Sequence, residues 1–148
     1  MKTHTTQMSE GLTKLLADTY TLYLKTQNFH WNVKGMHFYA LHKMFEEQYQ
    51  ELATAIDEIA ERIRALGSIA PASFFQFMQL TSIKEDTVTV NADEMIKKLL
   101  NDHEILAAHA SAIFTKAEKA QDEGTADLLI QRLKAHEKTA WMLKSTLS

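Results

Sequence analysis

The chain has 148 residues, 45% of them hydrophobic, and a formal net charge of −3. It contains no cysteine, which excludes disulfides, thiolate catalysis and zinc–thiolate sites, and its mixed charges leave no basic field for nucleic acid or an anionic membrane. A secretory signal and an apolar run of about 18 residues are both missing, so we expect a soluble, cytoplasmic protein with one domain over residues 1–148.

The first half of the sequence predicts two long helices, over residues 6–34 and 37–66. Apolar residues recur three or four positions apart in both, as in Leu12, Leu15, Leu16, Leu22, Phe29, Leu41, Phe45, Leu52, Ile56, Ile59 and Ile63. Gly35 and Gly67 supply the stops. Both segments exceed the usual helix length, which favours long antiparallel neighbours.

The helical period is lost between residues 68 and 90. Pro71 is suited to the first turn of a short helix over residues 72–79, and a polar loop over residues 81–90 follows. Asn91, with Glu94 three positions on, predicts the start of a third long helix. Gly124 is predicted to end that helix and Thr125 to cap a fourth. The expected fold is all-α: a four-helix bundle with a short extra helix in the long connection between helices two and three.

Two pairs of polar residues on the second helix predict a metal site. His42 and Glu46 lie one turn apart, as do Asp57 and Glu61, and the two pairs are about 16 Å apart along the axis. Positions 42 and 61 have the same midpoint, 51.5, as positions 46 and 57. Two copies of this helix packed antiparallel about a two-fold axis at that point would bring each His42 to Glu61 of the other copy.

His30 joins this site by a separate argument. It lies five residues before Gly35 and His42 lies seven after it, so in an antiparallel pair the two imidazoles come roughly level. Each site would then hold His30, His42 and Glu46 of one chain with Asp57 and Glu61 of the other. Two nitrogens and three carboxylates suit Fe(II), with Zn(II) and Mn(II) as competitors.

Other features of the sequence weigh on this interpretation. The chain contains no Glu-x-x-His, the sequence typical of a di-iron site inside a single bundle, so the predicted site requires a partner. Taken alone, a histidine on a helix is more often a surface or satisfied core residue, and an acidic pair is usually a solvated face. We interpret His103, His109 and His136 as structural, and His37 as a surface residue, with a supporting place beside the metal ligands as the alternative.

Several motifs resemble the Dps family, the ferritin-like mini-cages named as DNA-binding proteins from starved cells. They are residues 29–35 (FHWNVKG) with Phe38, Leu41 and His42, residues 57–62 (DEIAER), and Trp141-Met142, and the similarity spans essentially the whole chain. The resemblance implies a cage of twelve subunits that oxidises Fe(II), typically with hydrogen peroxide or else with oxygen, and stores ferric mineral against oxidative stress. Its ferroxidase ligands correspond to His30, His42, Asp57 and Glu61, with two iron sites per two-fold interface.

The resemblance bears on further residues. The family usually has Asp where this chain has Glu46, which makes Glu46 the weakest of the five expected ligands. Trp31, beside His30, is a candidate electron donor, with simple packing as the alternative. Asp122 and Asp127 correspond to acids that line three-fold pores in the family, where carboxylates concentrate Fe(II) for entry. Acids are also common near helix N-termini for electrostatic reasons alone.

Two alternative functions remain open from the sequence. DNA binding in the family usually depends on Lys/Arg-rich tails, and this sequence has only Lys2 before Lys14, so we expect weak direct DNA binding. The second alternative is a non-catalytic helical scaffold in which the histidines and acids are incidental.

Overall fold

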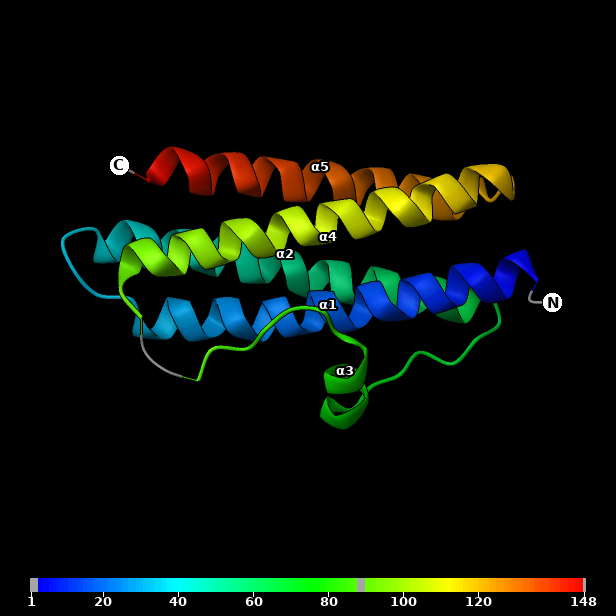
Figure 1. The fold of residues 1–148 in the computed structure, drawn as a ribbon, viewed down its shortest axis with the longest axis horizontal. Coiled ribbons are helices and arrows are strands. Elements are labelled where there is room, and N and C mark those ends of the chain that lie inside the picture. Colours follow the sequence, from blue (N-terminus) through cyan, green and yellow to red (C-terminus); the bar gives the residue numbers. More distant parts are fainter. Residues whose placement is uncertain (1–2, 88–89, 148) are drawn as a thin grey trace.

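Four long helices and one short helix make up the fold in the computed structural model, which describes residues 3–87 and 90–147 (Figure 1). In chain order they are α1 (His4–Asn32), α2 (Phe38–Ala65), α3 (Phe74–Leu80), α4 (Ala92–Lys119) and α5 (Glu123–Thr146). α1 packs along α2 and α4 along α5, and contacts between α1 and α4 join the two hairpins. The predicted four-helix bundle with a short helix in its long connection is confirmed.

The α1–α2 hairpin turns close to where the sequence predicts. Gly35 and Gly67 both have positive φ values, 117° and 94°, which residues other than glycine adopt only at a cost. α1 ends at Asn32 with Val33 as its C-cap, so Gly35 lies two residues beyond the cap. α2 ends at Ala65 with Leu66 as its C-cap, and Gly67 follows directly.

The connection from α2 to α4 runs back along the bundle, which makes these two helices parallel (Figure 1). α3 begins at Phe74 because the Ser73 hydroxyl accepts a hydrogen bond from the Gln76 N–H. Pro71 therefore precedes the cap, and its predicted place in the first helical turn is wrong. Part of the predicted loop, residues 88–89, lies outside the described residues.

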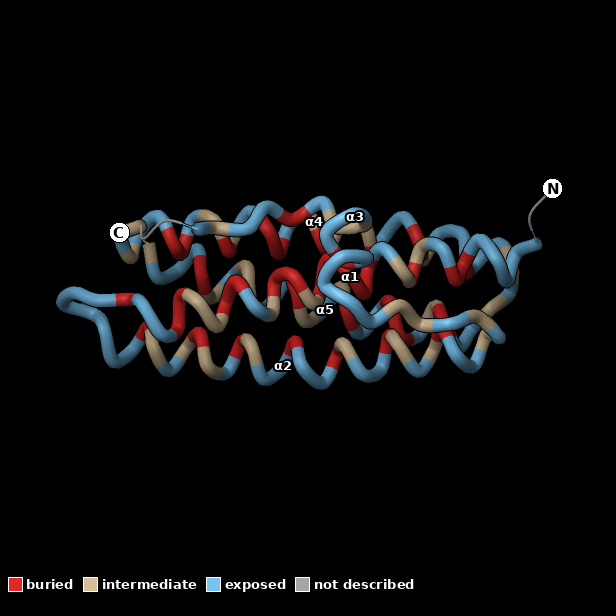
Figure 2. Tube along the Cα trace, turned by 90° about the horizontal axis from the view of Figure 1, so that it is seen from below, coloured by how far each residue is buried: buried red, intermediate tan, exposed pale blue. Residues whose placement is uncertain are grey.

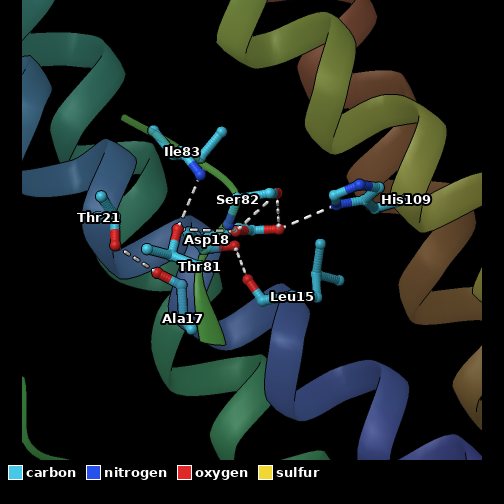
Figure 3. A network of polar contacts seen from close by, with 9 residues as sticks. Leu15, Ala17, Asp18, Thr21, Thr81, Ser82, Ile83 and His109 are labelled. Carbon is cyan, nitrogen blue, oxygen red and sulfur yellow. Dashed lines mark hydrogen bonds and ion pairs between the residues drawn. The ribbon is translucent and has the colours of Figure 1, made fainter. Parts of the chain in front are cut away.

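A buried carboxylate fixes the middle of this connection to the bundle. Asp18, 1% exposed on α1, accepts hydrogen bonds from the Thr81 hydroxyl and from the Ser82 N–H, at 2.8 and 2.7 Å. Figure 3 shows these contacts together with His109 of α4, whose Nδ1 lies 2.9 Å from the second oxygen of Asp18. One aspartate thus joins α1, α4 and the connection.

The α4–α5 turn differs from the prediction. Asn91 caps α4 as expected, but α4 ends at Lys119 and Gln121 takes the left-handed conformation, with φ 57°. Asp122, rather than Thr125, caps α5, and it does so by accepting the Thr125 N–H. Gly124 lies inside the first turn of α5, where a Cβ would come within 2.9 Å of the Arg62 guanidinium. The glycine permits this close approach and does not end a helix.

The core follows the inward-facing stripes of the four long helices (Figure 2). Its largest fully buried side chains are Phe29, Phe45, Met8, Leu12, Leu15, Leu16, Leu22, Leu52, Ile59, Ile63, Met95 and Ile96. Within residues 3–87 and 90–147, no helix combines the length and apolarity needed to cross a bilayer.

Candidate metal centre

His30 and His42 lie side by side across the α1–α2 hairpin. Their rings stack at a centroid distance of 3.9 Å and an interplanar angle of 11°. The Nδ1 of His30 contacts the backbone oxygen of His42 at 2.7 Å, and the Nδ1 of His42 contacts the backbone oxygen of His30 at 2.8 Å. A carbonyl oxygen only accepts, so each Nδ1 carries the hydrogen and donates it. In its neutral form, each ring then presents a lone pair at Nε2.

Glu46 completes a group of three acceptors. It lies one turn after His42 on α2, and its Oε1 is 3.9 Å from the Nε2 of His30. One ligand atom from each of His30, His42 and Glu46 lies within 4.8 Å of the others. Three acceptors that converge without a shared hydrogen favour a cation between them, and two imidazoles with a carboxylate suit a first-row divalent metal. Glu46, the weakest ligand by sequence, is the carboxylate nearest the imidazoles.

Aromatic rings enclose the two histidines. Phe38 stacks on His42 at 5.0 Å, and Tyr49 meets His30 edge-on at 5.2 Å. Tyr49 is not among the residues predicted from the sequence, although it lies seven residues after His42, two helical turns along the same face. The Trp31 side chain, by contrast, is 62% exposed, so its role as an electron donor stays a prediction.

Asp57 and Glu61 form a separate acidic pair further along α2. Both are exposed, and neither belongs to the group formed by His30, His42 and Glu46 within one chain. A hydrogen bond shared with Asp57, and then repulsion from its charge, raise the pKa of Glu61. Two carboxylates held this close attract cations. The meeting of this pair with the histidines of a second copy stays a prediction.

Asp122 and Asp127 lie in an acidic groove where α4 meets α5. Its lining includes four carboxylates, those of Glu118, Asp122, Glu123 and Asp127, beside apolar side chains such as Phe114 and Ile130. Asp122 also caps α5 and binds Arg62 at 2.9 Å. Burial alone would raise the pKa of Asp122, but hydrogen bonds from Thr125 and the Arg62 charge outweigh it and lower the pKa. This structural role of Asp122 was not predicted from the sequence.

A second histidine pair lies inside the bundle, where His103 of α4 and His136 of α5 meet with their Nδ1 atoms 2.9 Å apart. Arg132 lies beside the pair, with Nη2 3.2 Å from His136 Nε2. Burial, and then the Arg132 charge, lower the pKa of His103 to about 3. Burial, then His103 and Arg132, lower the pKa of His136 well below its ordinary value. Both rings are therefore neutral at pH 7.

Hydrogen bonds occupy the lone pairs of this inner pair. Arg132 only donates, so Nε2 of His136 accepts from it and Nδ1 of His136 carries the hydrogen. That hydrogen is donated to Nδ1 of His103, which leaves the remaining hydrogen of His103 on Nε2, an atom without a hydrogen-bond partner among the described residues. The inner pair thus offers no free lone pair to a metal.

Comparison with known proteins places the chain in a family. The ferritin-like domain family matches residues 9–148. A protein of Bacillus anthracis named DNA protection during starvation protein 2 is 40% identical over 142 residues, which cover 96% of this chain and 97% of the relative.

Solved structures agree with this match. The crystal structure of a Dps protein from Bacillus brevis covers 100% of both chains at 37% identity and a TM-score of 0.96. The Dps protein from Vibrio cholerae O1, described as a member of a broad superfamily of ferritin-like diiron-carboxylate proteins, covers 96% of this chain and 89% of its own at 33% identity and a TM-score of 0.93. The chain belongs to the Dps family of ferritin-like proteins.

Proposed function

We propose that this protein oxidises Fe(II) with hydrogen peroxide at centres shared between two copies, and stores the ferric product inside a cage of twelve. The observation that carries the proposal is the convergence of His30, His42 and Glu46, whose three ligand atoms lie within 4.8 Å of one another. Asp57 and Glu61 of a second copy would complete each centre, because their positions on α2 mirror those of Glu46 and His42 about residue 51.5.

The chemistry follows from the pairing of electrons. Two Fe(II) ions supply two electrons to one peroxide, its O–O bond breaks, and the products are two Fe(III) and two hydroxide ions. No hydroxyl radical is released when both electrons arrive together. Iron is the substrate here, and the chain contributes neutral imidazoles and carboxylates that hold it in place.

The relatives support an iron-related role in stress protection. Several are named DNA protection during starvation proteins, and the Vibrio cholerae structure is assigned to a diiron-carboxylate superfamily. With a net charge of −3, this chain is a poor ligand for phosphates, so we infer protection through iron removal and not through a DNA coat. A gel-shift assay at low salt that showed tight, salt-sensitive binding would contradict this inference.

Anaerobic Fe(II) titration followed by peroxide or oxygen tests the proposal. Wild-type protein should form a ferric chromophore rapidly, faster with peroxide than with oxygen, and both His42→Ala and Asp57→Ala should lose this reaction. His4→Ala is the matched control, because position 4 opens α1 about 39 Å from His30. Unchanged kinetics in the His42 and Asp57 variants would reject the site and leave the scaffold alternative.

Iron entry through the acidic groove is a second part of the proposal. Asp127 is exposed in the groove, whereas Asp122 also caps a helix. Asp127→Asn should slow mineral formation at limiting Fe(II) and leave the thermal midpoint of unfolding unchanged. If only Asp122→Asn slows mineral formation and also lowers the thermal midpoint, the loss reflects damage to the fold and contradicts iron entry through the groove.

A further inference from the structure

A line of three tyrosines leads away from the candidate metal centre. Tyr49 contacts the His30 ring at a centroid distance of 5.2 Å, Tyr23 lies 6.0 Å from Tyr49, and Tyr20 lies 5.6 Å from Tyr23. All three contacts are edge-on. His30, Tyr23 and Tyr20 lie on α1, and Tyr49 reaches from α2 into the gap of two helical turns between His30 and Tyr23.

The far end of the line lies next to an opening. Tyr20 lines a cavity of about 210 Å³ that is also bordered by Leu24, Phe77 and Met78. Beyond Tyr20, the ring contacts among the described residues continue only to phenylalanine, with Phe77 stacked at 5.1 Å and Phe74 edge-on at 6.3 Å. Phenylalanine has no ionisable hydroxyl and is far harder to oxidise than tyrosine. Tyr20 is therefore the terminus of the oxidisable line.

Packing alone does not require phenols at these positions. All three tyrosines are partly buried, and phenylalanine would fill the same apolar space. Within the line, the Gln27 amide donates a hydrogen bond of 3.1 Å to the Tyr23 hydroxyl oxygen. A donor at that oxygen stabilises the phenoxyl form, which can only accept.

We propose that Tyr49, Tyr23 and Tyr20 form a redox relay that supplies an electron when peroxide reacts at a centre where only one Fe(II) is available. This proposal rests on the proposed function, because the relay is needed only if iron at His30, His42 and Glu46 reacts with peroxide. One Fe(II) gives one electron to peroxide and Tyr49 gives the second. The O–O bond breaks, and the products are Fe(III), hydroxide, a water that includes the phenol proton, and the Tyr49 phenoxyl radical.

The radical then moves along the line. In each step the donor phenol loses one electron and one proton and the acceptor phenoxyl gains one of each, first between Tyr23 and Tyr49 and then between Tyr20 and Tyr23. At Tyr20 a small one-electron donor of the thiol or enediol class can reach the radical from the cavity and restore the phenol. The relay would keep hydroxyl radical from forming when a single Fe(II) meets peroxide.

The fourth tyrosine of the chain supplies a matched control. Tyr39 is 70% exposed at the start of α2, where its ring contacts Lys43, and it makes no ring contact with the line among the described residues. Each of the four tyrosines can be replaced by phenylalanine, which retains the ring and removes only the hydroxyl.

The test loads anaerobic protein with one Fe(II) per centre, adds peroxide, and freezes samples for electron paramagnetic resonance. A parallel sample receives a spin trap, and the adducts are located by peptide mass spectrometry. Wild-type and Tyr39→Phe proteins should give a tyrosyl radical with the adduct on Tyr20. Tyr49→Phe should lose the adducts at Tyr23 and Tyr20, and Tyr20→Phe should shift the adduct to Tyr23.

The outcomes separate this inference from the function beneath it. Iron oxidation in wild-type protein without a tyrosyl radical, or a Tyr20 adduct that survives Tyr49→Phe, would overturn the relay alone. Loss of the radical in Tyr39→Phe would also overturn it. Absence of iron oxidation in wild-type protein would overturn the proposed function, and the relay with it.

Discussion

The histidine pair between α1 and α2 and the buried pair between α4 and α5 have the same residue types but opposite chemistry. In His30 and His42, backbone carbonyls take both Nδ1 hydrogens, and a free lone pair remains on each Nε2. In His103 and His136, the rings bond to each other and to Arg132, and no lone pair remains. The backbone therefore prepares the first pair for a metal, and side chains use up the second.

The charge beside each pair strengthens the contrast. Glu46 faces His30 with a carboxylate, which attracts a cation. Arg132 faces His136 with a guanidinium, which repels one, and it is held there by two hydrogen bonds to Glu51. A histidine pair alone does not indicate a metal site; the hydrogen-bond partner of each nitrogen and the nearest charge decide it.

Replacement of one histidine in each pair should give the largest difference, measured as metal affinity. We expect His30→Gln to weaken Zn(II) or Fe(II) binding by more than about 100-fold, because it removes a direct ligand. His136→Gln should leave the affinity unchanged, since its lone pair already accepts from Arg132. Calorimetric titration of both variants under anaerobic conditions measures the difference, and equal losses would remove the contrast.

Low pH should destabilise the folded chain through His103 and His136. The unfolded histidines take up protons near pH 6.5, whereas burial keeps His103 neutral in the folded chain down to about pH 3 and also lowers the pKa of His136. The unfolded state then binds more protons, so stability is full above pH 6.5 and falls as the pH drops. The slope is about 1.4 kcal/mol per pH unit for each histidine.

Urea unfolding between pH 7.5 and 4.5 measures this slope. The double variant His103→Gln/His136→Gln should show a shallower slope than wild-type protein, whatever its stability at pH 7.5. Equal slopes in the two proteins would mean that His103 and His136 are protonated in the folded chain, which would contradict their neutral state.

Loss of the ion pair between Arg132 and Glu51 should have a smaller effect on stability. Arg132 is 3% exposed, while the Glu51 side chain is 43% exposed, so water partly screens their interaction. We expect Glu51→Gln to lower the free energy of unfolding by about 1–2 kcal/mol, because a buried guanidinium loses its charged partner. Glu47→Gln, at an exposed position one turn away, is the control for loss of charge on α2.

The smallest expected effect is that of Lys43, near His30 and His42, on metal affinity. Lys43 lies 3.8 Å from the second oxygen of Glu46, and the side chains are 49% and 31% exposed. An ion pair of this kind contributes no more than about 1 kcal/mol. Lys43→Met should therefore strengthen Zn(II) binding by at most about fivefold, measured by the same titration. A loss of affinity would mean that Lys43 helps to hold the site.

Much of the fold was predictable because local chemistry agreed with the long-range packing. The cap at Asn91 and the stop at Gly67 depend only on nearby residues, and both were placed correctly. Thr125 was misassigned because Asp122, three positions earlier, is an equally good cap, and Gly124 was misassigned because its role is to admit Arg62, about 60 positions away. A distant partner of this kind leaves no mark in the local pattern.

The candidate site shows the same division. That His30 and His42 lie side by side follows from their spacing around the hairpin, so this contact was predictable from the sequence. The tautomer of each ring was not predictable, because it depends on which backbone oxygen comes within reach of Nδ1. Tyr49 was missed because only the assembled hairpin shows that it touches His30.

Anomalous diffraction from a crystal soaked in Zn(II), a redox-inert substitute for Fe(II), shows whether two copies of the chain share the metal. We expect one metal position per centre, bound by His30, His42 and Glu46 of one copy and by Asp57 or Glu61 of a second. A metal bound by one chain alone, or between His103 and His136, would contradict it.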